Sequence, residues 1–204
     1  DTLNGGDGID SFDGGANSAS GDTIDFFGAV GSVSVDLSTG TIADDGYGNG
    51  ETVVNIENVD GSEIIDNITG DSGKNTLDGQ GGDDTLTGGA GSDTFKLSSG
   101  SDTVTDFNRT EGDSLSLDIS DLLDGSVIFT HDNGDDIVIN FTDSNNDAAQ
   151  MTLTGAGSDG TAAAQQGVTV NADANNGPVT TSAYLNNALD TLLADIAANP
   201  DVVT

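Results

Sequence analysis

The chain has 204 residues, and its 3 Lys and Arg against 36 Asp and Glu give a formal net charge of −33. That balance excludes nucleic-acid binding, which needs Lys and Arg on the phosphates, and disfavours direct binding to anionic membranes. Cys is absent and only 33% of the residues are hydrophobic, so the fold has neither disulfides nor a thick apolar core to stabilise it.

Residues 1–27 contain the first copies of a glycine-rich repeat of nine residues. The segment 5–13 follows the pattern Gly-Gly-x-Gly-x-Asp-x-apolar-x, and its sixth residue, Asp10, lies nine positions after Asp1. The next unit has extra residues before Asp22, so its register is shifted. Because the first four residues match the end of a repeat, we expect the chain to be part of a longer protein.

Residues 28–56 depart from the repeat and are expected to continue the same structure with a longer pair of strands. Residues 33–37 alternate like a half-buried strand, 41–50 are predicted as a loop, and 53–56 as a second strand. The loop has some features of an EF-hand, but Ile56 occupies the place of the terminal Glu, so an EF-hand is disfavoured.

Residues 57–105 form the regular part of the repeat, in which a polar side chain recurs every nine residues and an apolar one follows two positions later. The polar residues are Glu57, Asp66, Asn75, Asp84, Asp93 and Asp102, and the apolar ones are Val59, Ile68, Leu77, Leu86, Phe95 and Val104. Short strands separated by six-residue turns give two repeats per coil, so alternate repeats should form two facing parallel sheets. The predicted fold is all-β, a right-handed parallel β-roll.

Residues 106–155 should form β-strands that cap the open end of the roll, as solenoids require. Apolar runs at 127–129 and 137–141 flank Asn133-Gly134, which is a hairpin signal. Residues 151–153 are a further candidate strand.

Residues 156–204 are expected to form a linker and a short C-terminal α-helix. Leu185, Leu189 and Leu192 share one face at helical spacing, Ser182 can cap the start, and Pro200 follows the last turn. Packing against the cap and recognition by a transporter are both open for this helix.

The nine-residue units resemble the repeats of RTX proteins, which Gram-negative bacteria export by type I secretion. The resemblance extends to 34–40, 56–62 and 77–95, and 102–108 with 112–117 and 121–123 is similar to the C-terminal target region of type I substrates. It implies several bound Ca²⁺ ions, recognition of the C-terminus by an ABC transporter, and folding on extracellular calcium. The implied location is secreted, or on the cell surface within a large adhesin, and we expect a monomer.

Carboxylate and carbonyl oxygens are the ligands that Ca²⁺ prefers, whereas an isolated Asp-Gly would more simply cap a turn. Stacked turns are two repeats apart, so Asp66 should pair with Asp84 and Asp84 with Asp102, and Asn75 with Asp93 on the other side. The site at Asn75 should be weaker because this side chain has no charge. The predicted ligands are Asp1, Gly5, Asp7, Gly8, Asp10, Asp22, Asp66, Asn75, Gly79, Gly81, Gly82, Asp84, Gly88, Ala90, Gly91, Asp93, Asp102 and Asp113. Three acidic residues lie off the key position and should be solvated: Asp13, Asp78 and Asp83.

Two other functions remain open beside a non-enzymatic secretion and folding module. The chain could end a secreted enzyme such as a serralysin-like protease, a lipase or an alginate epimerase. It contains neither HExxH nor GxSxG, and His131, its only histidine, lies in a predicted turn, so we expect no enzyme within this chain. A ligand-binding or ice-binding roll is less favoured, because no Thr or Asn array recurs at the third and fifth positions of the repeats.

Overall fold

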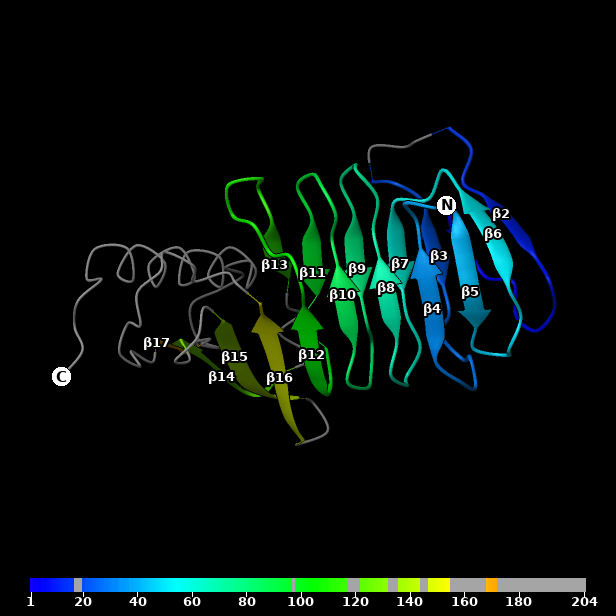
Figure 1. Cartoon of the computed structure of the whole chain (residues 1–204). Coiled ribbons are helices and arrows are strands. Elements are labelled where there is room, and N and C mark those ends of the chain that lie inside the picture. The colour runs from blue at the N-terminus through cyan, green and yellow to red at the C-terminus, as the bar shows by residue number, and fades with distance from the viewer. Residues whose placement is uncertain are drawn as a thin grey trace.

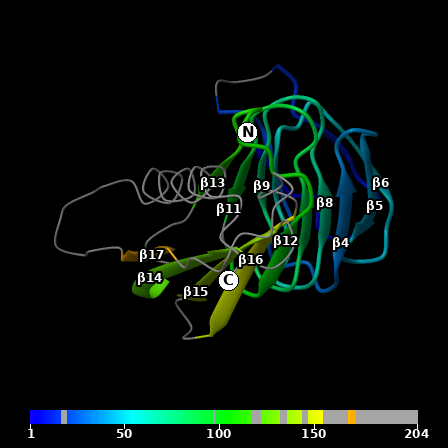
Figure 2. The same ribbon diagram turned by 60° about the vertical axis from the view of Figure 1, so that its left-hand side comes forward.

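The computed structural model describes residues 1–16, 20–96, 98–116, 122–131, 136–143, 147–154 and 168–171. Within these ranges the chain is all-β and contains no helix, and its strands form two sheets that face one another (Figures 1 and 2). The predicted fold, an all-β roll with parallel strands, is therefore confirmed. The predicted C-terminal helix lies outside the described residues.

The first sheet consists entirely of parallel strands in the order β1-β3-β7-β9-β11-β13. The strands are short because each is one half of a coil. Their bounds are Thr2–Leu3, Thr23–Asp25, Asn58–Asp60, Thr76–Asp78, Thr94–Lys96 and Ser114–Ser116. The register aligns the central apolar residues in one row, with Leu77 next to Phe95 and Phe95 next to Leu115.

The second sheet has the order β17-β14-β15-β16-β12-β10-β8-β4-β5-β6-β2. Its repeat strands are parallel neighbours: β8 (Asn67–Thr69), β10 (Thr85–Thr87) and β12 (Ser101–Val104). Beyond β8, β4 (Val33–Asp36) pairs in parallel with β8, and at the edge of the same end of the sheet β2 (Ser11–Asp13) pairs in parallel with β6 (Glu51–Val54). The roll thus continues through the irregular segment.

The predicted loop at 41–50 is wrong in its first half. Residues 41–45 form β5 (Thr41–Asp45), which pairs antiparallel with both β4 and β6. The strand forms because Ile42 is buried in the core while Thr41 and Ala43 are exposed. One apolar residue is too short a pattern to distinguish a strand from a loop.

The segment after the repeats adds strands to both sheets, and its antiparallel strands extend the second sheet. β13 is the last strand of the first sheet, and β16 (Ala148–Leu153) pairs in parallel with β12. The predicted hairpin is present as β14 (Leu122–His131) and β15 (Ile137–Asp143), which are antiparallel. β17 (Val168–Asn171) pairs with β14. His131 lies at the end of a strand rather than in a turn.

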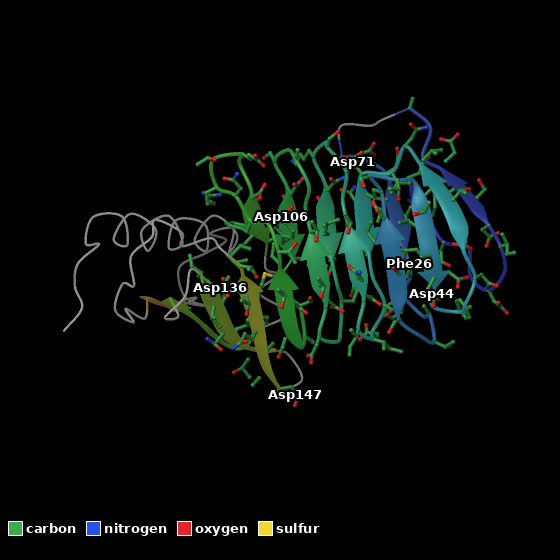
Figure 3. The ribbon with its side chains drawn as sticks, viewed as in Figure 1. Phe26, Asp44, Asp71, Asp106, Asp136 and Asp147 are labelled. Atoms are coloured by element: carbon green, nitrogen blue, oxygen red, sulfur yellow. The ribbon has the colours of Figure 1, made fainter. Side chains whose placement is uncertain are left out.

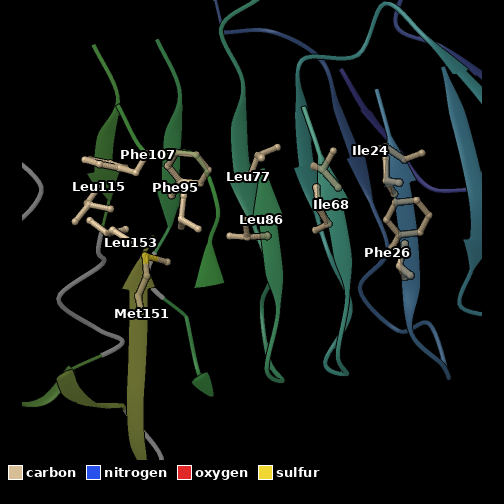
Figure 4. Close-up of a cluster of buried hydrophobic side chains, with 14 of the residues drawn as sticks. Ile24, Phe26, Ile68, Leu77, Leu86, Phe95, Phe107, Leu115, Met151 and Leu153 are labelled. Atoms are coloured by element: carbon tan, nitrogen blue, oxygen red, sulfur yellow. The ribbon is translucent and has the colours of Figure 1, made fainter. Parts of the chain in front are cut away.

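The core is a narrow band between the sheets (Figure 4). Leu77 and Phe95 come from one sheet, Ile68 and Leu86 from the other, and all four are fully buried. The ring of Phe107 packs against the ring of Phe95, and the two ring centroids are 6.0 Å apart. Because each short strand contributes one such side chain, apolar burial per residue is small, and folds of this kind need additional stabilisation. No helix of the described residues is long and apolar enough to span a membrane.

Candidate metal centres

The sixth residue of each repeat lies immediately before a strand, and these residues form hydrogen-bonded rows along the roll. In the row beside the second sheet, the N–H of Asp66 donates to Asp84 Oδ1 (2.8 Å), and that of Asp84 donates to Asp102 Oδ1 (3.2 Å). In the row beside the first sheet, the N–H of Asn75 donates to Asp93 Oδ1 at 2.9 Å. The predicted pairs are therefore brought together, one coil apart. We call these rows the carboxylate ladders.

The ladder beside the first sheet extends beyond the regular repeats at both ends. The N–H of Asp93 donates to Asp113 Oδ1 at 2.9 Å, and that of Asp22 donates to Glu57 Oε2 at 2.8 Å. The amino group of Asp1 forms an ion pair with Asp22. Asp1, Asp22 and Asp113, which were predicted as ligands, therefore occupy ladder positions, although Asp22 and Asp113 do not follow the preceding repeat by nine residues.

The ladder beside the second sheet also contains a residue that was not predicted from the sequence, Glu51. Glu51 accepts the N–H of Asp10 through Oε1 at 3.1 Å, and the residues after each, Thr52 and Ser11, are paired in register. Glu51-Thr52-Val53 has the same order of acid, Thr and apolar residue as Asp84-Thr85-Leu86, which is the signal that could have identified it.

The ladder side chains are buried, and several lack a full set of partners. Asp22, Asp84 and Asp93 are at most 2% exposed, and the Oδ2 of each has no hydrogen-bond partner. Removing a carboxylate oxygen from water without a partner is strongly unfavourable unless a cation compensates it. These unpaired oxygens fit a bound cation, which would compensate their negative charge.

Burial raises the pKa of the central ladder carboxyls. It raises the pKa of Asp84 to about 8, and the charges of Asp102 and Asp66 act in the same direction. The pKa of Asp102 is raised to about 7 and that of Asp93 to about 6, again mainly by burial. Main-chain N–H donors oppose the shift without cancelling it. At neutral pH the metal-free ladder therefore holds carboxyls that resist ionisation.

Glycines let each carboxylate fold back over its own turn. A Cβ on Gly79 would collide with Oδ2 of Asp84, and one on Gly88 with Oδ2 of Asp93. Among the described residues no three acidic or histidine side chains converge on one point. A cation in the ladders would therefore need main-chain oxygens as well, and the turns predicted to supply them lie beside the ladder. The remaining predicted positions in these turns are Gly5, Asp7, Gly8, Gly81, Gly82, Ala90 and Gly91.

A matched pair of glycine variants tests how closely the turns must stack. Gly91 has φ 129°, and a Cβ there would collide with the carbonyl oxygen of Gly73, one coil earlier. Gly8 holds the same repeat position with φ 137°, but its Cβ would have nothing closer than Asp10 Oδ2 at 4.0 Å. Backbone strain should lower the free energy of unfolding of both alanine variants by about 1–3 kcal/mol. Gly91→Ala should lose more stability than Gly8→Ala because of the collision. Urea midpoints in saturating calcium measure the difference, and equal losses would contradict obligatory close stacking.

The three acidic residues that lie outside the sixth position of the repeats were predicted to be solvated, and two of them are. Asp13 and Asp83 are exposed, but the prediction for Asp78 is wrong, since it is 8% exposed. Lys96 Nζ lies 2.9 Å from Asp78 Oδ2 and 3.3 Å from Asp60 Oδ1. The parallel register stacks the last residues of neighbouring strands, so the lysine stem covers the carboxylates.

A comparison with protein-family models matches the RTX calcium-binding nonapeptide repeat (4 copies) to residues 1–18, 60–95 and 69–104. Residues 1–18 and 60–104 therefore contain RTX calcium-binding nonapeptide repeats. RTX nonapeptide repeats bind several Ca²⁺ ions, in agreement with the unpaired ladder oxygens. No curated protein matches the chain. Which residues bind each ion, and the weaker site at Asn75, stay predictions.

Proposed function

We propose that this RTX chain is the non-enzymatic C-terminal module of a secreted adhesin, which carries a type I secretion signal and folds on extracellular Ca²⁺. The observation that carries the proposal is the set of buried ladder carboxylates, with unpaired oxygens on Asp22, Asp84 and Asp93. Without a cation these groups oppose folding, and with one they favour it.

The electrostatics suit export in the unfolded state. The net charge of −33 opposes compaction by self-repulsion, so a chain in a calcium-poor cytosol remains extended and can be threaded through a transporter. Calcium outside the cell neutralises the ladders as the chain emerges. Folding at the exit then opposes backward movement, and the module remains as a monomer in the medium or on the cell surface.

The partner in this proposal is a type I ABC transporter that recognises the C-terminus. The test is export of the full chain from a Gram-negative host that carries a type I apparatus. Deletion of residues 182–204 should abolish export, whereas deletion of 157–167 within the expected linker should not. With chelator in the medium, the exported chain should be sensitive to protease, and with calcium it should be resistant. Export that is unaffected by the 182–204 deletion would refute the secretion signal.

A ligand-binding or ice-binding surface is a second candidate, and one observation favours it. Thr recurs at outward positions along the second sheet, as at Thr85 and Thr87 of β10, at Thr103 of β12 and at Thr105 just after β12. The hydroxyls of Thr87 and Thr105 are 2.7 Å apart. A freezing point below the melting point in calcium-saturated protein would support this candidate. The alternative of a module that ends an enzyme depends on the residues that precede Asp1 in the full protein.

A further inference from the structure

The irregular segment 28–56 encloses a partly open cavity where it meets the first repeat. The cavity has a volume of about 20 Å³, enough for one ion or water molecule, and is lined by Asn4, Gly5 and Gly6 of the first turn and by Asp45, Tyr47 and Glu51 of the β5–β6 hairpin, together with Asp25 and the aromatic rings of Phe12, Phe26 (labelled in Figure 3) and Phe27. Hairpin residues 41–54 lie outside every range that matches the RTX repeat.

Glu51 presents an unpaired oxygen at this cavity. Its side chain is 6% exposed, Oε1 accepts the N–H of Asp10, and Oε2 has no hydrogen-bond partner. Burial raises the pKa of Glu51, and the charges of Asp45 and Asp10 add to the shift. The carboxylate is therefore held among like charges, in an arrangement that a cation would relieve.

Asp45 provides a second carboxylate at the same cavity and is held ionised by its own loop. Oδ1 accepts the N–H groups of Tyr47 (2.8 Å) and Asn49 (2.9 Å), and Oδ2 accepts the Asn49 side-chain amide (3.1 Å). These bonds outweigh burial and lower the pKa of Asp45. Asp45 is only 2% exposed, so the loop keeps a buried negative charge in place.

We propose that this cavity is a Ca²⁺ site at the junction between the first RTX repeat and the inserted hairpin, with Asp45 and Glu51 as its carboxylate ligands. The other oxygens come from main-chain carbonyls of the first turn and the hairpin loop, or from water, because Ca²⁺ takes six to eight oxygens with flexible geometry. An ion here joins the first repeat to the inserted hairpin, whose β6 is the parallel neighbour of β2. The inference does not depend on the proposed role in secretion.

Tyr47 makes this site visible by spectroscopy. The chain has no Trp and two Tyr, Tyr47 and Tyr184, and Tyr47 lines the cavity. Tb³⁺, a substitute for Ca²⁺, should therefore show emission sensitised by tyrosine excitation that saturates and is displaced by Ca²⁺. Tyr47→Phe in the full chain should remove most of this emission, and Tyr184→Phe should retain it.

Glu51→Gln tests the ligand directly. Gln keeps an oxygen acceptor for the N–H of Asp10 but replaces the unpaired oxygen by an amide, so half-saturation by Tb³⁺ should rise by about tenfold or more. Native mass spectrometry should show one Ca²⁺ fewer. Glu111→Gln is the matched control, because Glu111 is exposed in a turn at the opposite end of the roll, and it should change neither readout.

The outcomes are decisive even if one variant folds poorly. Circular dichroism in saturating calcium shows whether Glu51→Gln is folded, and a folded variant with unchanged emission and ion number overturns the site. If it does not fold, Tyr47→Phe decides, since it removes only a hydrogen bond to the carbonyl of Gly28. Loss of emission with an unchanged number of bound Ca²⁺ supports the site, and retained emission overturns it.

Discussion

In calcium-free buffer at neutral pH the chain is expected to lose its β-structure, and Ca²⁺ is expected to restore it cooperatively. Without a cation, the buried carboxylates of Asp66, Asp84 and Asp102 face one another along one ladder. An ion at ten to a hundred times its Kd would add about 1.4–2.7 kcal/mol to the free energy of unfolding. Because domains are stable by only about 5–15 kcal/mol, several ions decide whether the roll forms.

The measurement is a Ca²⁺ titration that follows far-UV circular dichroism and hydrodynamic radius together. Mg²⁺ is the control, because it demands strict octahedral geometry and dehydrates reluctantly. We expect a rise in β signal and a decrease in radius with Ca²⁺ at concentrations where Mg²⁺ has no effect. A chain that is already compact and β-structured in chelator would contradict the calcium switch.

A matched pair of double variants assigns this effect to the ladder. Asp84→Asn with Asp102→Asn removes two buried charges, so the difference in β signal with and without Ca²⁺ should shrink. Asp13→Asn with Asp83→Asn removes the same charge from exposed positions and should leave the difference nearly unchanged. Equal effects in the two variants would show that net charge, rather than the ladder, governs calcium dependence.

The ladder could be predicted from the sequence because its geometry follows from the period of the repeat. Residues nine apart alternate between two sheets, so residues eighteen apart become neighbours, as Asp66 and Asp84 do. The apolar residue two positions later must then face inward, as Ile68 and Leu86 do. No long-range information beyond the period was needed for either result.

The inserted hairpin could not be predicted in the same way. Glu51 reaches its ladder position only because β6 pairs with β2, about forty residues earlier in the chain, and no period links the two. The burial of Asp78 likewise depends on Lys96 one coil later.

Acid is expected to replace calcium in part and to stabilise the metal-free roll. The folded-state pKa values of Asp84, Asp102 and Asp93, about 8, 7 and 6, lie above the ordinary value of 3.8. Between these limits the folded chain binds more protons than the unfolded chain. The free energy of unfolding of the metal-free chain therefore rises as the pH falls from about 8 towards 4. This gain in stability is lost as the pH rises through the folded-state pKa values.

Circular dichroism in chelator at several pH values between 8 and 5 measures this dependence through the β signal. The β signal should rise as the pH falls, in the opposite sense to a protein whose carboxyls have lowered pKa values. The pKa values of Asp36 and Asp45 are lowered from the ordinary value of 3.8, so these groups do not act in this window. A β signal that falls on acidification would refute the assignment.

Because acid also reduces the repulsion of the whole chain, the ladder's share of the pH effect requires a variant. Asp84→Asn mimics the protonated carboxyl and keeps an oxygen acceptor for the N–H of Asp66. It should raise the β signal in chelator at pH 8, flatten the pH dependence and weaken Ca²⁺ binding. Asp83→Asn, at an exposed neighbour, should do none of these. A ladder carboxylate therefore lowers the stability of the metal-free chain and provides its response to Ca²⁺. Asp84→Asn separates these two effects, because it should raise the stability of the metal-free chain and lower the affinity for Ca²⁺.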